Sequence, residues 1–346
     1  MSRPVARVAL AVGAIVATLG LSACGGSTQA AGAPPTSVRL GYFPNLTHIT
    51  AIVADKEGFF GKYLGATKLQ VSTFNAGPAA IEALKSGAID VTYVGPGPAI
   101  NGFINSGGQA LTIVAGAATG GASLVVDPSI TSVAHLRGKK VSTPQLGNTQ
   151  DIALRYWLQQ HGLKTDLQGG GDVSVLPQAN AQIVDAFKQK QIAGAWVPEP
   201  YATELVRAGG KVLVDERDLW PGRKFSTTVL AVSTAFLKAH PQTVTELLEG
   251  DLDAVDFIAM DPAKAQKDVG EVIASLSGKA PSSAVTAQAW KQLSFTVDPA
   301  AASLLAGAQH AYQVGVLTTK PQLNGLVDLT LLNKLLKARG KQAIAP

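Results

Sequence analysis

The chain of 346 residues contains a single cysteine, Cys24. A disulfide within the chain is therefore impossible, and a redox or zinc site built on a Cys-x-x-Cys motif is excluded. The five histidines are scattered, and no two of them have the spacing that would bind one metal ion. Walker-type phosphate loops, a Gly-x-Gly-x-x-Gly motif after a strand and a Gly-x-Ser-x-Gly motif are also missing. We therefore expect no metal, no cofactor and no catalytic activity.

Charged residues are sparse as well, with 29 Lys and Arg against 24 Asp and Glu. The formal net charge is +5, and loss of Arg3 and Arg7 with the N-terminal segment would leave 27 − 24 = +3, which is too weak a bias to predict binding to nucleic acid. A basic stripe with interleaved aromatic side chains, which such binding would need, is missing from the sequence. We therefore expect no nucleic-acid partner.

The N-terminal apolar run, Val8 to Leu19, is too short to cross a membrane as a helix. Because Arg3 and Arg7 precede it and small residues follow it, residues 1–23 are typical of a secretory signal peptide. Leu-Ser-Ala followed by Cys24 resembles the lipobox of bacterial lipoproteins. This resemblance implies cleavage before Cys24, lipidation of its sulfur and anchoring to the outer face of the cell membrane. An incidental free thiol is the alternative.

Residues 24–37 carry no charge and, after the cysteine, consist of Gly, Ser, Thr, Gln, Ala and Pro. Such a segment cannot bury enough apolar surface to fold, so we expect a flexible tether. The remainder begins at Val38 and is long enough for two domains of ordinary size.

Two modules each occur twice in this remainder. The first is a strand, a polar loop and a helix, over residues 38–56 and again over 140–161. The second is a helix, a buried strand and a Pro-x-Pro segment, over residues 79–98 and again over 181–200. Because both modules recur in the same order about a hundred residues later, the pattern indicates two lobes of similar α/β design.

Strands that alternate with helices predict mostly parallel sheets with helices on both faces. We interpret residues 112–126 and 225–233 as hinge strands, and the helical patterns over 244–257 and 326–336 as additions to the first lobe. Ligands bind beyond the carboxyl ends of such strands, so two lobes that face each other by these edges enclose one cleft. The predicted lobe 1 comprises residues 38–122 and 226–346, and the predicted lobe 2 comprises residues 123–225.

Neutral polar side chains gather where predicted strands end and helices begin. Asn45 and Thr47, then Asn148 and Thr149, stand just ahead of helices, where side-chain oxygens cap free backbone N–H groups. Together with the helix N-termini they predict a concave site that suits an oxyanion; capping alone is the alternative. Further candidates near the hinge strands are Thr119, Gly121, Ser123, Thr227 and Thr228.

Two further candidates accompany the second Pro-x-Pro segment. Glu199, held between two prolines, is expected to face the cleft and meet a donor or cationic group of a ligand. A surface ion pair is the alternative. Trp196 is a candidate for stacking on a ligand, although a place in the core is the commoner role of such a residue.

Several segments resemble the nitrate/sulfonate/taurine class of ABC-transporter substrate-binding proteins, in style closest to lipoproteins that bind aliphatic sulfonates. They are "VRLGYFPNLTH", "FNAGPAAIEALKSGAIDVTYVGPGPAI", "HLRGKKVSTPQLGNTQDIALRYWL" and "AWVPEPYATELV". The resemblance covers Val38 to about Gly340. His135 departs from it, since many relatives carry Asp there.

The resemblance implies a two-lobed periplasmic-binding fold of type II that closes on its ligand, then docks on a membrane permease whose separate ATPase powers import. It implies that five loops face the ligand: 44–47, 95–98, 120–123, 148–150 and 198–199. The loops add Gly95, Pro96, Gly97 and Gln150 to the candidates.

The ligand stays open at this point. An aliphatic sulfonate or similar small oxyanion is the first expectation, and taurine, nitrate or a thiamine-precursor pyrimidine are alternatives on the same fold. A small-molecule enzyme or a sensor on this fold is the alternative of a different class. We expect a monomer.

Overall fold

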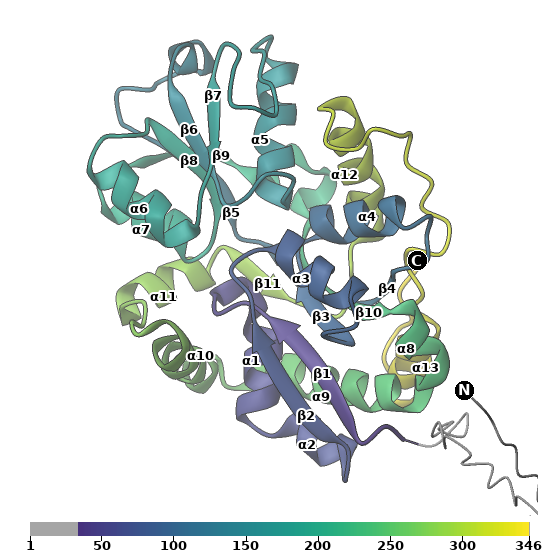
Figure 1. Ribbon diagram of the computed structural model, residues 1–346. Helices are drawn as coiled ribbons and strands as arrows, with labels where there is room; N and C mark the ends of the chain where they lie inside the picture. The colour runs from purple at the N-terminus through teal and green to yellow at the C-terminus, as the bar shows by residue number, and fades with distance from the viewer. Residues whose placement is uncertain (1–33, 346) are drawn as a thin grey trace, which may run out of the picture.

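The computed structural model describes residues 34–345. The expected signal peptide, Cys24 and most of the expected tether lie outside the described residues. Within them, two β-sheets are each flanked by helices, and the chain passes from the first sheet to the second and back (Figure 1). No helix of this described part is long and apolar enough to cross a membrane.

The first sheet has six strands in the order β11-β4-β10-β3-β1-β2. β1 pairs in parallel with β2 and β3, whereas β10 lies antiparallel between β3 and β4. β11 is antiparallel to β4, so pairing is mixed although β1 to β4 share one direction. The strands are β1 (Ser37–Tyr42), β2 (Lys68–Thr73), β3 (Val91–Val94), β4 (Leu111–Gly120), β10 (Ser226–Ser233) and β11 (Leu293–Phe295).

The second sheet has five strands in the order β7-β6-β8-β5-β9. β6 is parallel to β7 and β8, and β5 lies antiparallel between β8 and β9. As expected, most strands of each sheet run in one direction. The sheets are nevertheless mixed, because the hinge strands β10 and β5 pair with their neighbours in antiparallel fashion. The strands are β5 (Ala122–Val126), β6 (Lys140–Thr143), β7 (Ser174–Pro177), β8 (Gly194–Pro198) and β9 (Lys211–Asp215).

Helices cover both faces of each sheet, and four apolar clusters fill the space between them. One face of the first sheet packs on α1 (Ile49–Lys56), α2 (Phe59–Leu64), α9 (Pro241–Met260), α10 (Pro262–Ser277) and α13 (Thr330–Ala338). Its other face packs on α3 (Gly77–Lys85), α4 (Pro96–Asn105) and α12 (Ala301–Gln313). The second sheet lies between α5 (Thr149–Gln160) and the pair α6 (Asn180–Lys188) and α7 (Tyr201–Arg207). The remaining helices are α8 (Thr234–Ala239), α11 (Ser283–Trp290) and the 3-10 turns η1 (Leu46–His48), η2 (Val133–Leu136), η3 (Glu216–Leu219) and η4 (Pro221–Arg223).

We call the parts built on the first and second sheets lobe 1 and lobe 2. The chain enters lobe 2 where β4 runs into β5 through Gly120 and Gly121, whose φ angles are 73° and 69°. A Cβ on Gly121 would lie 2.2 Å from Leu293 Cδ2, so both backbone angle and space favour glycine there. The chain returns through η3 and η4 into β10. The strands predicted over 112–126 and 225–233 are present, whereas the helix predicted over 326–336 starts only at Thr330.

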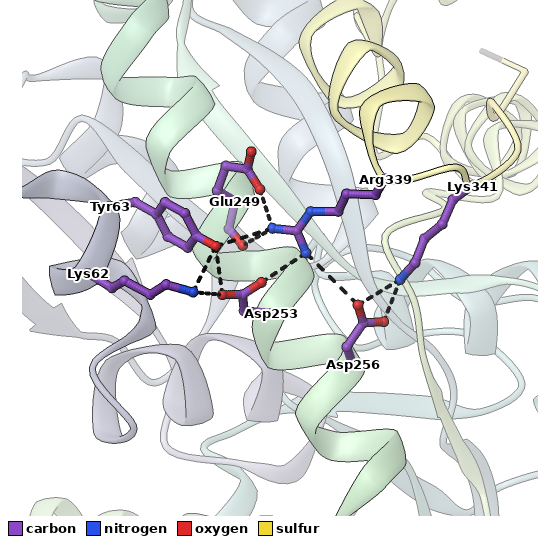
Figure 2. A network of polar contacts seen from close by, with 7 residues as sticks. All are labelled: Lys62, Tyr63, Glu249, Asp253, Asp256, Arg339 and Lys341. Atoms are coloured by element: carbon purple, nitrogen blue, oxygen red, sulfur yellow. Dashed lines mark hydrogen bonds and ion pairs between the residues drawn. The ribbon is translucent and has the colours of Figure 1, made fainter.

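The C-terminal segment is tied to α9 by a polar network (Figure 2). Arg339 Nη1 lies 2.9 Å from Asp253 Oδ1, and Lys62 Nζ lies 2.8 Å from the other oxygen of that carboxylate. Because these groups are partly exposed, each pair contributes little alone, and the network serves mainly to hold the segment after α13 on lobe 1. Its members are Lys62, Tyr63, Glu249, Asp253, Asp256, Arg339 and Lys341.

Candidate functional site

A cavity of ≈ 40 Å³ lies between the two lobes. This volume holds a few water molecules or one small polar group. Its walls include these residues named from the sequence: Asn45, Thr47, Gly95, Asn148, Thr149, Gln150 and Thr227. They also include Phe43, His48, Asn75, Ala76, Gly77, Pro98, Pro144, Asn180 and Pro198.

Four α-helices begin at this cavity. α3 starts at Gly77, α4 follows Gly95, α5 follows Asn148 and α6 starts at Asn180. Free backbone N–H groups and the positive end of the helix dipole favour an anion at each such start. Since no Lys, Arg, Asp or Glu within residues 34–345 lines the cavity, this backbone field and neutral side chains set its electrostatics.

Asn45 orders the turn that carries the lobe 1 side of the cavity. Its Oδ1 accepts hydrogen bonds from the Thr47 N–H at 3.1 Å and from Thr47 Oγ1 at 2.7 Å. Asn45 is thus the cap that the sequence predicted, and as a cavity-lining residue it has an amide nitrogen that could donate to a ligand.

Asn148 caps a helix in lobe 2, where its Oδ1 accepts a hydrogen bond from the Asp151 N–H at 2.9 Å. Asp151 in turn accepts from Thr143 Oγ1 at 2.9 Å and from the Gly147 N–H at 3.0 Å. Arg155 Nε donates to Asp151 at 3.0 Å, and both side chains of this ion pair are at most 1% exposed. A buried carboxylate and its guanidinium therefore fix the loop that positions the Asn148 amide nitrogen.

His48 is a wall residue that the sequence treated only as one of five scattered histidines. The Phe43 N–H donates to its Nδ1 at 3.2 Å, and the Phe43 ring stacks on the imidazole with centroids 4.2 Å apart. Burial lowers the pKa of His48 to about 3, so the ring is neutral and carries its proton on Nε2. His48 is thus a neutral donor, and its place directly after the Asn-x-Thr cap was the available signal.

Thr149 joins the lobes. The Gly97 N–H of lobe 1 donates to Thr149 Oγ1 at 3.1 Å. A Cβ on Gly95 would lie 2.6 Å from this oxygen, and a Cβ on Gly97 would lie 3.0 Å from the Thr149 nitrogen. The two glycines therefore allow the N-termini of α4 and α5 to meet, a role that differs from the direct ligand contact expected of them.

Other sequence candidates lie away from the cavity. Pro96 and Gly97 line a neighbouring cavity, while Gly121 and Ser123 belong to the β4–β5 crossing. Trp196 is fully buried in β8, where its Nε1 donates to Glu216 Oε2 at 2.7 Å. It packs in the core of lobe 2, the alternative that the sequence had left open.

Glu199 is buried at the start of α7 and does not line the cavity. Its carboxylate accepts the Thr203 N–H and the Thr203 hydroxyl, each at 3.0 Å. Burial raises its pKa to about 7, against the opposing effect of these hydrogen bonds. The carboxylate therefore caps α7 instead of forming the surface ion pair that was the sequence-based alternative.

Asn180 is a second residue that the sequence missed. It is 9% exposed, and its Oδ1 is buried without a hydrogen-bond partner in the described part of the chain. The repeated helix–strand module predicted from the sequence begins at Ala181, so it does not include Asn180. Among residues 34–345, no group of three His, Cys, Asp or Glu side chains is arranged to hold a metal ion.

The chain belongs to the NMT1-like family, whose model matches residues 31–274. A binding protein of Brucella abortus (strain 2308) is 28% identical over 229 residues, which cover 65% of this chain and 68% of that protein. A candidate aliphatic sulfonates-binding protein of Escherichia coli (strain K12) is 30% identical over 210 residues, which cover 59% of this chain and 62% of that protein.

Solved structures share the fold. The alkanesulfonate-binding protein SsuA from Xanthomonas axonopodis pv. citri, bound to MOPS, aligns with a TM-score of 0.70 at 22% identity, covering 86% of this chain and 99% of its own. The nitrate-binding protein NrtA from Synechocystis PCC 6803 aligns with a TM-score of 0.73 at 17% identity, covering 88% and 89%. The expected periplasmic-binding fold and the resemblance to the nitrate/sulfonate class are both confirmed.

Proposed function

We propose that this chain is the substrate-binding component of an ABC importer and that it binds an aliphatic sulfonate or a similar small oxyanion. The observation that carries the proposal is the meeting of four helix N-termini at one cavity without a charged side chain. Amide, hydroxyl and imidazole donors surround the same space, and an oxyanion pairs with such donors without a counter-cation.

The relatives support the transport role. Their names describe binding proteins, and the structural neighbours were solved as sulfonate- and nitrate-binding proteins. By the same proposal the chain acts as a monomer without catalysis, is held on the outer face of the membrane through Cys24, and delivers its ligand to a permease. Adjacent genes for a permease and an ATPase would support import; a receptor gene in their place would favour a sensor.

Calorimetry on the purified chain without residues 1–23 tests the ligand. We expect ethanesulfonate to bind, and ethyl methyl sulfone, which has a similar shape without the charge, to give no heat. Nitrate and sulfate, titrated in the same way, show whether the organic group contributes. The ligand claim fails if none of these anions binds, or if the sulfone binds as well as the sulfonate.

Taurine is a second candidate because of Asn180. Asn180 lines the cavity, and its Oδ1, which has no partner among residues 34–345, is an acceptor that an ammonium group would satisfy. We expect Asn180→Ala to lower the affinity for taurine more than that for ethanesulfonate, which has no such group. An equal loss for both ligands would contradict this reading. The pyrimidine alternative has little support, because Trp196 and Glu199 lie outside the cavity.

A further inference from the structure

A second cavity of ≈ 240 Å³ lies beside α5, on the side of the segment that returns the chain to lobe 1. We call it the aromatic cavity. It shares no residue with the cavity of the proposed oxyanion site. Its walls are Ala153, Tyr156, Trp157, Gln160, His161, Glu216, Leu219, Trp220 and His310.

The rings of this cavity come from both lobes. Tyr156 on α5 stacks on His310 of α12 with centroids 3.6 Å apart and planes 11° apart. Trp220, between η3 and η4, lies 5.5 Å from His310, centroid to centroid. Burial lowers the pKa of His310 to about 4, so this imidazole is a neutral ring near pH 7. A flat molecule in the cavity therefore meets aromatic surface from lobe 1, lobe 2 and the segment between them.

Among the described residues of the wall, Glu216 is the one acidic or basic group apart from the histidines, and it is 1% exposed. Its Oε2 accepts Trp196 Nε1–H at 2.7 Å. A carboxylate has about four lone-pair positions, so one indole donor leaves room for more. In the described part of the chain no Lys or Arg forms an ion pair with Glu216. Buried carboxylates usually have a cationic partner, and here the protein supplies none.

We propose that the aromatic cavity is a second binding site, which takes a single-ring aromatic cation whose N–H groups pair with Glu216 and whose ring lies against Trp220. Indole is the aromatic side chain with the strongest attraction for a cation, and the buried carboxylate supplies the matching charge. A cavity of 150 Å³ already admits benzene, so ≈ 240 Å³ suffices for one ring and an amidinium-sized group.

Benzamidine is the test probe, with benzamide as its uncharged counterpart of similar shape. Burial raises the pKa of Glu216 to about 7, so titrations followed by calorimetry are run at about pH 8.5, where the carboxylate is ionised. We expect saturable binding of benzamidine, at least about tenfold tighter than that of benzamide. Equal affinities for the two probes, or no binding of benzamidine, would overturn the proposal.

Glu216→Gln keeps an acceptor for Trp196 and removes the charge, so it should abolish the preference for benzamidine. Trp220→Leu should weaken the binding of both benzamidine and benzamide. If Glu216→Gln does not fold, this variant alone shows whether the probes bind in the aromatic cavity. Tyr312→Leu, on an exposed part of α12 outside the cavity, is the matched control and should change nothing. A preference that survives both cavity substitutions contradicts the proposal.

A competition titration separates this site from the oxyanion site. We expect benzamidine to bind equally well with and without saturating ethanesulfonate or to bind more tightly with it, since both sites contact both lobes. Displacement of one by the other would place benzamidine in the first cavity and overturn the proposal. Titration with benzamidine alone tests the aromatic cavity whether or not ethanesulfonate binds. Failure of the proposed function would appear as a lack of ethanesulfonate binding, and it would leave the benzamidine result unchanged.

Discussion

Asn148 combines two tasks in one side chain, and substitutions separate them. Its Oδ1 caps α5 through the Asp151 N–H, and by our proposal its amide nitrogen donates to the ligand in the cavity that Asn148 lines. Asn148→Asp keeps the capping oxygen but places a negative charge in the cavity. Asn148→Ala removes both groups. We therefore expect Asn148→Asp to bind sulfonate more weakly than Asn148→Ala does. Because Asn148→Asp keeps the cap, we also expect it to unfold at a higher temperature than Asn148→Ala.

The expected losses of stability and of binding free energy follow from the two roles of Asn148. Loss of the cap costs about 1 kcal/mol of stability, and loss of a hydrogen bond to a charged ligand costs roughly 1–3 kcal/mol of binding. Calorimetry and thermal unfolding measure the two separately. Asp261→Asn is the matched control, because Asp261 caps α10 through the Lys264 N–H and does not line the cavity. Wild-type affinity in Asn148→Asp would show that this side chain only caps its helix.

At the scale of elements, a buried acid links the first sheet to α9. Tyr93 of β3 donates its hydroxyl to Asp251 Oδ1 at 2.6 Å, and Asp251 Oδ2 is buried without a partner among the residues that the structure describes. Burial raises the pKa of Asp251 from 3.8 to about 7, against the opposing effect of the Tyr93 hydrogen bond. The fold therefore favours the protonated acid, and this contribution is present below pH 4 and lost as the pH rises through 7.

Asp251→Asn imitates the protonated acid at every pH. We expect the free energy of unfolding of the wild type to fall between pH 5 and pH 8, and to fall less in this variant. The shift of about three pKa units corresponds to roughly 4 kcal/mol in total, of which the interval from pH 5 to pH 8 covers at most roughly 3 kcal/mol. Urea unfolding at the two pH values measures this change in the free energy of unfolding. Glu246→Gln is the control, because Glu246 lies on the same helix and is partly exposed. Identical pH dependence of the wild type and Asp251→Asn would refute the assignment.

At the scale of the whole molecule, the contact between the starts of α4 and α5 controls how closely the lobes approach. Gly95 has an ordinary extended backbone, so alanine is tolerated by lobe 1 itself. Its Cβ would, however, lie 2.6 Å from Thr149 Oγ1 of lobe 2. We expect Gly95→Ala to lower sulfonate affinity at least about tenfold with unchanged thermal unfolding of the free protein.

A double-mutant cycle shows whether the lobes are responsible. In a Thr149→Ala background the oxygen is gone, so Gly95→Ala should cost less than it does alone. Small-angle scattering should show a larger radius of gyration for Gly95→Ala with ligand than for the wild type with ligand. Gly270→Ala, where an added Cβ meets nothing, is the control. Additive losses in the cycle would rule out the proposed contact between the lobes.

Local signals in the sequence predicted much of this protein. Strand and helix patterns recurred in order and indicated two α/β lobes, because the side-chain periods of strands and helices are local properties. The caps at Asn45 and Asn148 were predictable for the same reason, since a cap bonds to a backbone group two or three residues ahead. The resemblance to the sulfonate- and nitrate-binding class also rested on short segments of sequence.

Contacts between distant segments were decided by the tertiary structure alone. Trp196 was a reasonable stacking candidate until β8 placed it in the core, with its indole N–H on Glu216, 20 residues away. Thr149 was expected to bind a ligand, and the fold also set its hydroxyl against Gly97, 52 residues away in the other lobe. The sequence by itself determined the order of strands and helices and the caps at Asn45 and Asn148, because these depend on residues close together in the chain. Only the packing of lobe against lobe determined which residues share a cavity, because that depends on pairs of groups far apart in the chain.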